Sequence, residues 1–274
     1  MKLSFTKMNG AGNDFVMLDN RSRSLSLTPK QIEFLCDRHR GIGGDGLLLV
    51  EPPTSAQSAF RMRYYNSDGS EADMCGNGAR CFSRFAQKVG GGGKQFAFET
   101  NAGLIRTEID GRQVRINLSQ PHSLRLKERV ALASGETEIH SINTGVPHAV
   151  LLTPDAGAVD VQNLGHEIRF HRHFAPKGTN VNFVEKVDNK TIRVRTYERG
   201  VEAETLACGT GVTASALISH LLLQIPSPVQ VRVKGGDTLE ISFSRQGEQF
   251  TDVFLKGPAD FVFEGQIELE DSIG

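Results

Sequence analysis

The chain lacks an excess of charge of either sign. Its 31 lysines and arginines are balanced by 32 aspartates and glutamates, and the formal net charge is −1. Such a balance creates no basic field for nucleic acid and no charged tail for a membrane surface. Charged residues that alternate with apolar ones between Leu124 and Val130 indicate the solvated face of a strand or helix. We therefore expect neither nucleic acid nor membrane as a partner.

Long apolar runs are also lacking. The nearest candidate, Ala214 to Ile225, contains His220 and is shorter than the roughly 20 residues that a membrane span needs. The N-terminal segment has no apolar core after Lys2, so a signal peptide is not expected. We predict a cytoplasmic protein, in whose reducing environment the four cysteines stay thiols.

What the chain does contain is an internal repeat. In the first half, GIGGDGLLLVE (Gly41 to Glu51) precedes YYNSDGSEADMCGNGARC (Tyr64 to Cys81). In the second half, KGTNVNFVEK (Lys177 to Lys186) precedes TYERGVEAETLACGTGVTA (Thr196 to Ala214). A helical segment and a pair of strands follow each copy. Two copies are too few for a solenoid, so the repeat predicts two pseudo-symmetric domains.

Each domain is predicted to enclose one helix. The first helix begins near Gly76 and ends at the glycines 90–93, and the second begins near Gly209 and ends before Pro226. The second is apolar almost all round, which is typical of a helix buried on every side. We predict an α+β fold of two pseudo-symmetric domains, each a mostly antiparallel, barrel-like β-sheet wrapped around a central helix. Residues 1–120 with 263–274 form the half that carries Cys75, and residues 121–262 form the half that carries Cys208.

Two cysteines stand at matching places of the repeat, each in the pattern Cys-Gly-X-Gly at a helix start. The partial positive charge of a helix N-terminus lowers the pKa of a thiol and stabilises anions. A thiolate at Cys75 or Cys208 can remove a proton from one face of a carbon next to a carboxylate, while the other cysteine returns a proton to the opposite face. The backbone N–H groups that could bind this carboxylate are those of Gly76, Asn77, Gly209 and Thr210.

The other cysteines, the histidines and the glycine-rich segment do not predict a functional site by themselves. Cys36 and Cys81 have the pattern of small buried residues. No CxxC is present, and His171 and His173 alternate along a segment that we expect to be extended, so no metal site is predicted. The glycine-rich GIGGDG lacks the Lys-Ser/Thr of a P-loop.

Seven motifs resemble one known family along nearly the whole chain. The motifs are GAGNDF (Gly10 to Phe15), HRGIGGDG (His39 to Gly46), NSDGSEADMCGNGARC (Asn66 to Cys81), GVPH (Gly145 to His148), GTNVNF (Gly178 to Phe183), YERGVEAET (Tyr197 to Thr205) and ACGTG (Ala207 to Gly211). The sequence resembles the diaminopimelate epimerase family. The resemblance implies interconversion of LL- and meso-diaminopimelate in lysine and cell-wall precursor synthesis, a substrate cleft between two domains, no pyridoxal phosphate, no metal and a homodimer.

The resemblance also implies roles for particular residues. Cys75 and Cys208 match the family's acid–base pair, and His148 and Glu198 match residues that tune these cysteines. Donors to the carboxylate at the reacting carbon are matched by Gly76, Asn77, Gly209 and Thr210. Contacts to the far amino-acid end of the substrate are matched by Asn13, Asn66, Asn180, Glu198 and Arg199. Without the resemblance, turn or cap roles would explain the three asparagines equally well.

Three positions depart from the family pattern. Val146 stands where many members have Asn, and Gly46 stands where many have Gln. Both changes remove side-chain hydrogen bonds, so we expect altered contacts at the far end of the substrate and looser selectivity. Phe263 replaces a tyrosine linked to dimerisation, and a homodimer is still expected.

Three other functions can be weighed against the sequence. A proline or hydroxyproline racemase also uses a pair of Cys-Gly motifs, but it has no need for Asn13, Asn180 and Arg199 together. An isomerase with a carboxylate base would not keep both Cys75 and Cys208. A redox or amino-acid-binding protein could join the two cysteines in a switchable disulfide.

Overall fold

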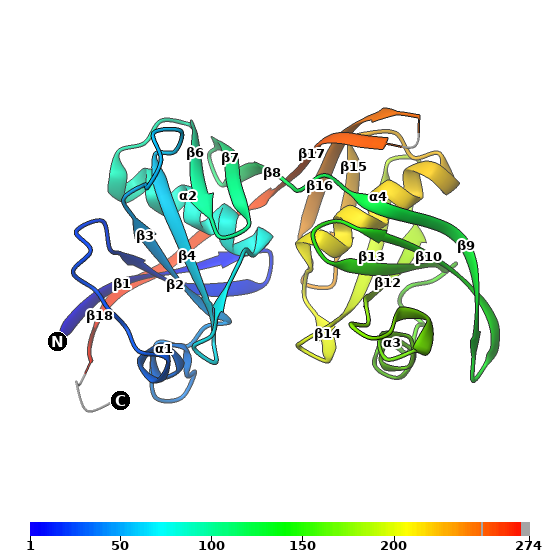
Figure 1. Cartoon of the computed structure of the whole chain (residues 1–274), viewed down its shortest axis with the longest axis horizontal. Helices are drawn as coiled ribbons and strands as arrows, with labels where there is room; N and C mark the ends of the chain where they lie inside the picture. The colour runs from blue at the N-terminus through cyan, green and yellow to red at the C-terminus, as the bar shows by residue number, and fades with distance from the viewer. Residues whose placement is uncertain (248, 270–274) are drawn as a thin grey trace. The chain divides into compact units, whose positions relative to one another are not determined.

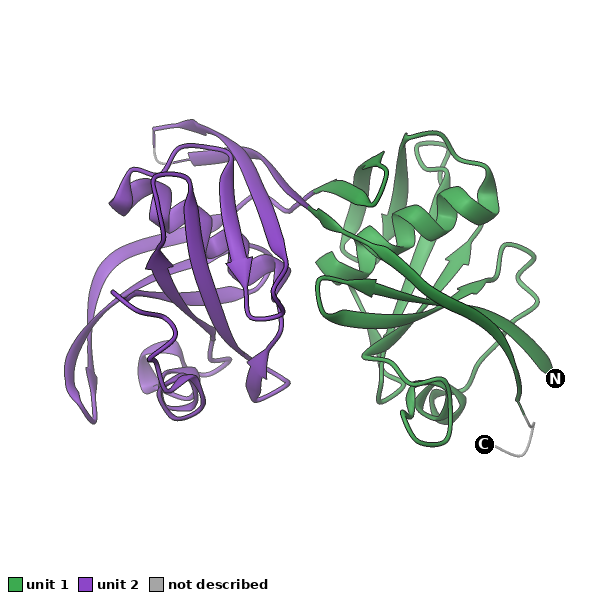
Figure 2. Cartoon of the chain, turned by 180° about the vertical axis from the view of Figure 1, so that it is seen from behind, with its two compact units in different colours: residues 1–116, 257–274 green, residues 117–256 purple. Residues whose placement is uncertain are grey.

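The chain folds into two compact units in a computed structural model that describes residues 1–247 and 249–269. The first unit comprises Met1–Ile116 and the segment that begins at Gly257, and the second comprises Asn117–Lys256 (Figure 2). The domain boundaries expected from the sequence follow residues 120 and 262. Residues 270–274 of the expected first domain lie outside the described part of the chain.

Strands of the first unit surround one long helix, α2, and a short helix, α1, lies outside them (Figure 1). Its elements are β1 (Lys2–Gly10), β2 (Asn13–Asp19), α1 (Pro29–Cys36), β3 (Gly46–Glu51), β4 (Phe60–Asn66), β5 (Glu71–Ala72), α2 (Gly76–Gly90), β6 (Gln95–Thr100), β7 (Gly103–Asp110), β8 (Gln113–Asn117) and β18 (Asp260–Glu268).

The second unit has the same arrangement around α4, with α3 outside the strands (Figure 1). Its elements are β9 (His122–Leu132), β10 (Gly135–Asn143), β11 (Pro147–Leu152), α3 (Val161–Arg169), the 3₁₀ turn η1 (Arg172–Phe174), β12 (Asn180–Lys186), β13 (Thr191–Glu198), β14 (Ala203–Thr205), α4 (Gly209–Leu223), β15 (Val229–Val233), β16 (Thr238–Gln246) and β17 (Gln249–Pro258).

Strand pairing repeats between the units element by element. The parallel pairs β2·β3 and β4·β6 of the first unit correspond to β11·β12 and β13·β15 of the second. Antiparallel hairpins such as β6·β7 and β15·β16 recur in the same places. The extra strand β18 pairs with β1 as β9 pairs with β10. The predicted fold class is thereby confirmed, with two parallel pairings inside each otherwise mostly antiparallel sheet.

Both central helices occupy the predicted segments. One face of α2 buries Ala79, Phe82, Phe85 and Ala86, and the helix ends where Gly91 adopts a left-handed φ of 67°. The apolar α4 is buried through most of its length and ends at Gln224, which is also left-handed. None of the helices in residues 1–247 and 249–269 is long and apolar enough to cross a membrane.

One local prediction is wrong. The segment with His171 and His173 is not extended, because His171 caps the short turn η1 by accepting a hydrogen bond from the backbone N–H of His173. The two rings contact the neighbouring strand β9: His171 lies 3.2 Å from the carbonyl oxygen of Ala131, and His173 lies 3.1 Å from a carboxylate oxygen of Glu128. Tertiary contacts thus decide the local conformation.

Candidate active site

Cys75 lies at the N-cap of α2, as the Cys-Gly-X-Gly pattern predicts. Its backbone is extended (φ −135°), and its Sγ accepts a hydrogen bond from the backbone N–H of Gly78 at 3.5 Å. The side chain is partly exposed. Gly76 and Asn77 form the first turn of the helix, where backbone N–H groups have no partner within the helix. The cysteine therefore lies, only partly buried, at the positive end of a helix dipole.

Asn13 and Asn77 contact one another beside this cysteine. Asn77 Nδ2 donates to Asn13 Oδ1 at 2.5 Å, and Asn77 is buried while Asn13 is half-buried. The turn between β1 and β2 approaches the helix so closely that a Cβ at Gly10 would lie 2.7 Å from the carbonyl oxygen of Asn77. Only glycine fits there. This close approach brings the start of β2 to the N-terminus of α2.

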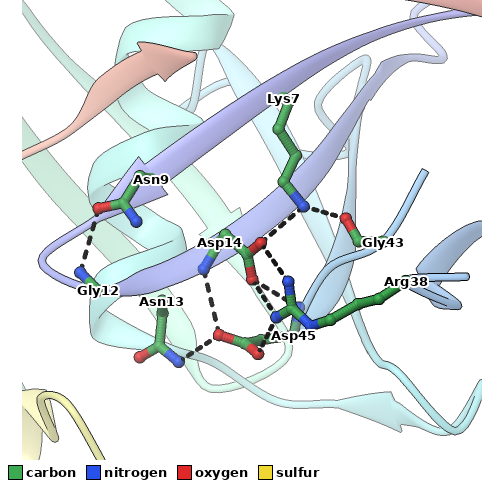
Figure 3. Close-up of polar contacts among 8 residues, drawn as sticks. All are labelled: Lys7, Asn9, Gly12, Asn13, Asp14, Arg38, Gly43 and Asp45. Carbon is green, nitrogen blue, oxygen red and sulfur yellow. Dashed lines mark hydrogen bonds and ion pairs between the residues drawn. The ribbon is translucent and has the colours of Figure 1, made fainter. Parts of the chain in front are cut away.

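An ionic cluster supports the Asn13 end of this contact (Figure 3). It consists of Lys7, Asp14, Arg38 and Asp45. Arg38 contacts both carboxylates, at 2.7 Å for Asp14 and 2.8 Å for Asp45. Asn13 Nδ2 donates to Asp45 Oδ2 at 2.8 Å. Burial alone would raise the pKa of Asp14, but hydrogen bonds from Arg38 and Lys7 outweigh it and hold that pKa well below its usual range.

Asn66 has a turn role in the structure. Its backbone N–H donates to the carbonyl of Ser70 at 2.9 Å, and its side-chain Nδ2 donates to Ser70 Oγ at 3.1 Å. It lies at the end of β4, in register with Gly46 on β3. These contacts support a turn role for Asn66, which the sequence offered as the alternative to substrate binding.

Cys208 lies at the N-cap of α4, in the place that corresponds to Cys75. It is buried, with 7% of its surface exposed, and its Sγ lies 3.6 Å from Thr210 Oγ1. Thr144 fixes the first turn of the helix by donating its hydroxyl to the carbonyl of Thr210 at 2.9 Å. Gly209 begins the helix, as predicted.

His148 belongs to a buried neutral cluster beneath this helix. Asn182 Nδ2 lies 3.1 Å from His148 Nδ1 and 3.0 Å from the carbonyl of Ala149, and the hydroxyl of Thr196 donates to Asn182 Oδ1 at 2.9 Å. Burial, with a smaller contribution from the charge of Arg199, lowers the pKa of His148 to about 3. A neutral ring that accepts at Nδ1 carries its proton on Nε2. A Cβ at Gly211 would lie 2.4 Å from Asn182 Oδ1, so this cluster packs directly against the first turn of α4.

Asn180, Glu198 and Arg199 lie together at the neighbouring strand ends. The amide of Asn180 joins two segments: it donates to the carbonyl of Pro147 at 3.0 Å and accepts from the backbone N–H of Arg199 at 2.9 Å. Glu198 Oε2 accepts from the hydroxyl of Thr205 at 2.8 Å. The second unit therefore brings a carboxylate and a guanidinium to the region of His148.

The two remaining cysteines are structural. Burial raises the pKa of both Cys36 and Cys81 to about 12, so each stays a protonated thiol near neutrality. Among residues 1–247 and 249–269, no group of three or more His, Cys, Asp or Glu side chains is placed to hold a metal ion.

Sequence reasoning missed the residues that support the candidate site. These are Lys7, Asp14, Arg38, Asp45, Arg80 and Asn182. A signal existed for Asn182, because Asn180 and Asn182 stand two apart in a strand and so share one face. Asparagine is rare in strands, and two on one face indicate a polar site. For the ionic cluster, charged residues inside the GAGNDF and HRGIGGDG motifs were the available hint.

Solved structures share this two-unit architecture. A probable proline racemase from Agrobacterium radiobacter K84, with bound carbonate, matches 98% of the chain and 93% of its own length at a TM-score of 0.75 and 14% identity. A hydroxyproline epimerase from Agrobacterium vitis, with bound trans-4-hydroxy-L-proline, matches all of the chain and 94% of its own length at a TM-score of 0.74 and 15% identity. The fold is thus one found in amino-acid racemases and epimerases.

Sequence comparison assigns the family. The model for diaminopimelate epimerase matches residues 5–122 and 140–262. The diaminopimelate epimerase of Aquifex aeolicus is 45% identical over 98% of the chain and 99% of its own length, and that of Archaeoglobus fulgidus is 40% identical over 99% and 98%. This chain belongs to the diaminopimelate epimerase family.

Proposed function

We propose that this protein interconverts LL- and meso-diaminopimelate by a two-base mechanism in lysine and cell-wall precursor synthesis, with Cys75 and Cys208 as the bases. The observation that carries the proposal is the repeated placement of the two cysteines. Each is the N-cap of the central helix in its unit, and the two helices are equivalent in a topology that repeats strand by strand. Membership of an epimerase family supplies the reaction class.

The chemistry needs one thiolate and one thiol. The thiolate takes the α-proton and leaves an electron pair on the carbon, which delocalises into the adjacent carboxylate. Helix N-terminal N–H groups of Gly76, Asn77, Gly209 and Thr210 stabilise this developing charge. The thiol of the other cysteine then protonates the opposite face, so the two sulfurs end with exchanged protonation states and no other reactant is consumed.

Recognition of the far end of the substrate is assigned to groups of both units. Arg199 provides a cation for the second carboxylate and Glu198 provides an anion for the second ammonium, with Asn13, Asn66 and Asn180 as hydrogen-bonding partners. His148 and Glu198 are assigned to tuning the cysteines. Diaminopimelate has two amino-acid head groups, and a site that pairs both would leave polar groups unpaired with a simpler amino acid.

Proton exchange tests the proposal directly. Reduced protein is incubated with LL-diaminopimelate in heavy water, and NMR follows both α-deuteration and appearance of the meso isomer. We expect both in the wild type and neither in Cys75→Ala or Cys208→Ala. Exchange with proline but not with diaminopimelate would move the substrate assignment to a sister racemase. Absence of exchange with every amino acid tested would reject the enzymatic proposal.

A homodimer in the cytoplasm completes the proposal. Phe263 and Val262 on β18 are large apolar residues that are 49% and 56% exposed, and Phe263 packs edge-on against Phe5 at 5.8 Å. Such residues are suited to an interface between copies. A mechanism with two free thiols is also suited to the cytosol, where reducing conditions keep cysteines from forming disulfides. Sedimentation velocity of the wild type and of Phe263→Asp tests the dimer, and only the variant is expected to sediment as a monomer.

A further inference from the structure

Four side chains of the first unit form a continuous line of hydrogen bonds. Arg80 Nη2 donates to Asn77 Oδ1 at 2.9 Å, Asn77 Nδ2 donates to Asn13 Oδ1 at 2.5 Å, and Asn13 Nδ2 donates to Asp45 Oδ2 at 2.8 Å. We call this line the amide relay. It links the first turn of α2 to the start of β2 and to the loop before β3.

The chemistry of its two ends gives the relay one direction. A guanidinium only donates hydrogen bonds, so the amide of Asn77 must turn its oxygen toward Arg80. A carboxylate only accepts, so the amide of Asn13 must turn its nitrogen toward Asp45. Reversing either amide would place donor against donor or acceptor against acceptor. Both amide orientations therefore follow from the residues at the ends.

Both ends of the relay are themselves held in place. Arg80 is completely buried and also donates to the carbonyls of Gly10 and Pro258, each at 3.3 Å. Asp45 accepts from Arg38 through one oxygen, and through the other it accepts from the backbone N–H of Asp14 at 3.2 Å (Figure 3). Neither end can rotate to suit a flipped amide without losing these contacts.

We propose that Asp45 and Arg80 are positioning residues: Asp45 directly, and Arg80 through the amide of Asn77, fix the side chain of Asn13 as a hydrogen-bond donor toward the substrate. An amide nitrogen carries two N–H groups, and Asp45 takes one of those on Asn13. The second is assigned to a carboxylate oxygen of the amino-acid head group bound at Asn13. The oxygen of Asn13 is engaged by Asn77, so the relay selects a carboxylate there over an ammonium. This inference rests on the proposed function, in which Asn13 and Asn77 contact the substrate.

Removing the acceptor at residue 45 tests the relay. Asp45→Leu leaves Asn13 Nδ2 without the acceptor that fixes its orientation, whereas Asp45→Asn could keep that contact by turning its amide oxygen toward Asn13. In Asp45→Leu we expect KM for diaminopimelate to rise about 10- to 100-fold, as for loss of a hydrogen bond to a charged group, with kcat changed less. In Asn13→Asp two carboxylates face one another, and Tm should fall.

The double variant separates positioning from folding. Asn13→Asp combined with Asp45→Asn restores a hydrogen bond of reversed polarity, so Tm should recover most of the loss seen in Asn13→Asp. Residue 13 then has no N–H for the substrate, so KM should stay at least about tenfold raised. Recovery of KM together with Tm would overturn the proposal, because it would reduce the relay to a structural role.

Arg38→Met is the matched control. It removes the ion pair of Asp45 but keeps the acceptor for Asn13, and Arg38 is more than half exposed, so KM should stay within about threefold. A KM in Asp45→Leu no higher than that of this control would also overturn the proposal. Should the wild type exchange no amino-acid proton, the proposed function fails separately. Tm values of Asn13→Asp, of Asp45→Asn and of the double variant then still test the relay, which fails if the effects of the two single variants simply add.

Discussion

The two cysteine-bearing helix starts have equivalent backbones but different polar surroundings. Around Cys75, the supporting residues are charged: the ionic cluster of Lys7, Asp14, Arg38 and Asp45, and the buried Arg80 on α2 itself. Around Cys208, the closest support is neutral: His148, Asn182 and Thr196 beneath α4. Repetition of the fold has not repeated the electrostatics.

This difference bears directly on the proposed two-base reaction. Two identical surroundings would favour the same protonation state in both cysteines, yet the proposed mechanism needs one thiolate and one thiol. The ionic cluster is also redundant, since Asp14 would still form its ion pair with Lys7 if Arg38 were replaced. The neutral cluster has no such second partner, because His148 Nδ1 and the hydroxyl of Thr196 both depend on Asn182. Substitution of the residues that support the start of α2 should therefore be tolerated better than substitution of those that support the start of α4.

The largest expected effect is the loss of activity when Cys75 or Cys208 is replaced. Replacing either cysteine by alanine removes one acid–base group, and such a group typically contributes about 10²–10⁴-fold. Both epimerisation and α-proton exchange should fall by at least that factor in Cys75→Ala and in Cys208→Ala, measured by NMR in heavy water. Cys81→Ala is the control, because its buried thiol lies outside the proposed chemistry, and its kcat should be nearly unchanged. A variant of Cys75 or Cys208 that retained full turnover would remove that residue from the mechanism.

A second prediction compares the stability lost when one residue is removed from each supporting network. Asn182→Leu leaves the Nδ1 atom of His148 and the hydroxyl of Thr196 without their buried partner, so the free energy of unfolding should fall by about 3 kcal/mol. Arg38→Met removes a side chain that is 54% exposed, and should cost less than about 1 kcal/mol. Urea unfolding of both variants measures the two costs. Equal losses would contradict the contrast between a redundant and a non-redundant network.

Acidification should destabilise the second unit at a higher pH than the first. Burial lowers the pKa of His148 from 6.5 to about 3, so the folded state binds fewer protons than the unfolded chain between these values. Stability is then complete above about pH 6.5 and is lost progressively as pH falls toward 3. Burial also lowers the pKa of His140 in the same unit. Asp14 of the first unit, whose pKa is lowered from 3.8, loses its contribution only below about pH 4.

Hydrogen exchange read by mass spectrometry tests this order. At pH 5, corrected for intrinsic rates, peptides of β11 and β12 should lose protection before those of β2 and β3. His148→Gln should remove much of the difference. If β2 and β3 open first in the wild type, the contrast in acid stability is wrong.

The sequence was sufficient to predict the elements whose signal is local. The helices after Cys75 and Cys208 begin with glycine, carry apolar residues at helical spacing or all round, and end at Gly91 and before Pro226. The likeness of the two units followed from the repeat, since two copies of one order of elements imply one topology used twice. Both are properties of short stretches or of their order along the chain.

The supporting networks could not be predicted in this way. Asn13 and Asp45 are separated by 32 residues and Asn77 and Asn13 by 64, so no pattern of local spacing relates them. Their contacts depend on the parallel pairing of β2 with β3 and on the close approach at Gly10. The extended conformation expected for His171 and His173 failed for the same reason, because a distant strand supplies their partners.

The smallest expected effect compares the short outer helices, α1 and α3. Thr28 caps α1 with a complete capping box, in which its hydroxyl accepts from the backbone of Gln31 and the side chain of Gln31 accepts from the backbone of Thr28. Asp160 caps α3 by accepting hydrogen bonds from the backbone N–H of Asn163 at 3.1 Å and from the side-chain amide of Asn163 at 2.6 Å. Alanine at either cap should cost about 1 kcal/mol, and Thr28→Ala should cost more because it dismantles a reciprocal pair. Urea midpoints of the two variants decide the order, with Thr28→Ser as the control that keeps the hydroxyl. A greater loss in Asp160→Ala would show that the charge of that cap at the helix dipole outweighs the second hydrogen bond of the box.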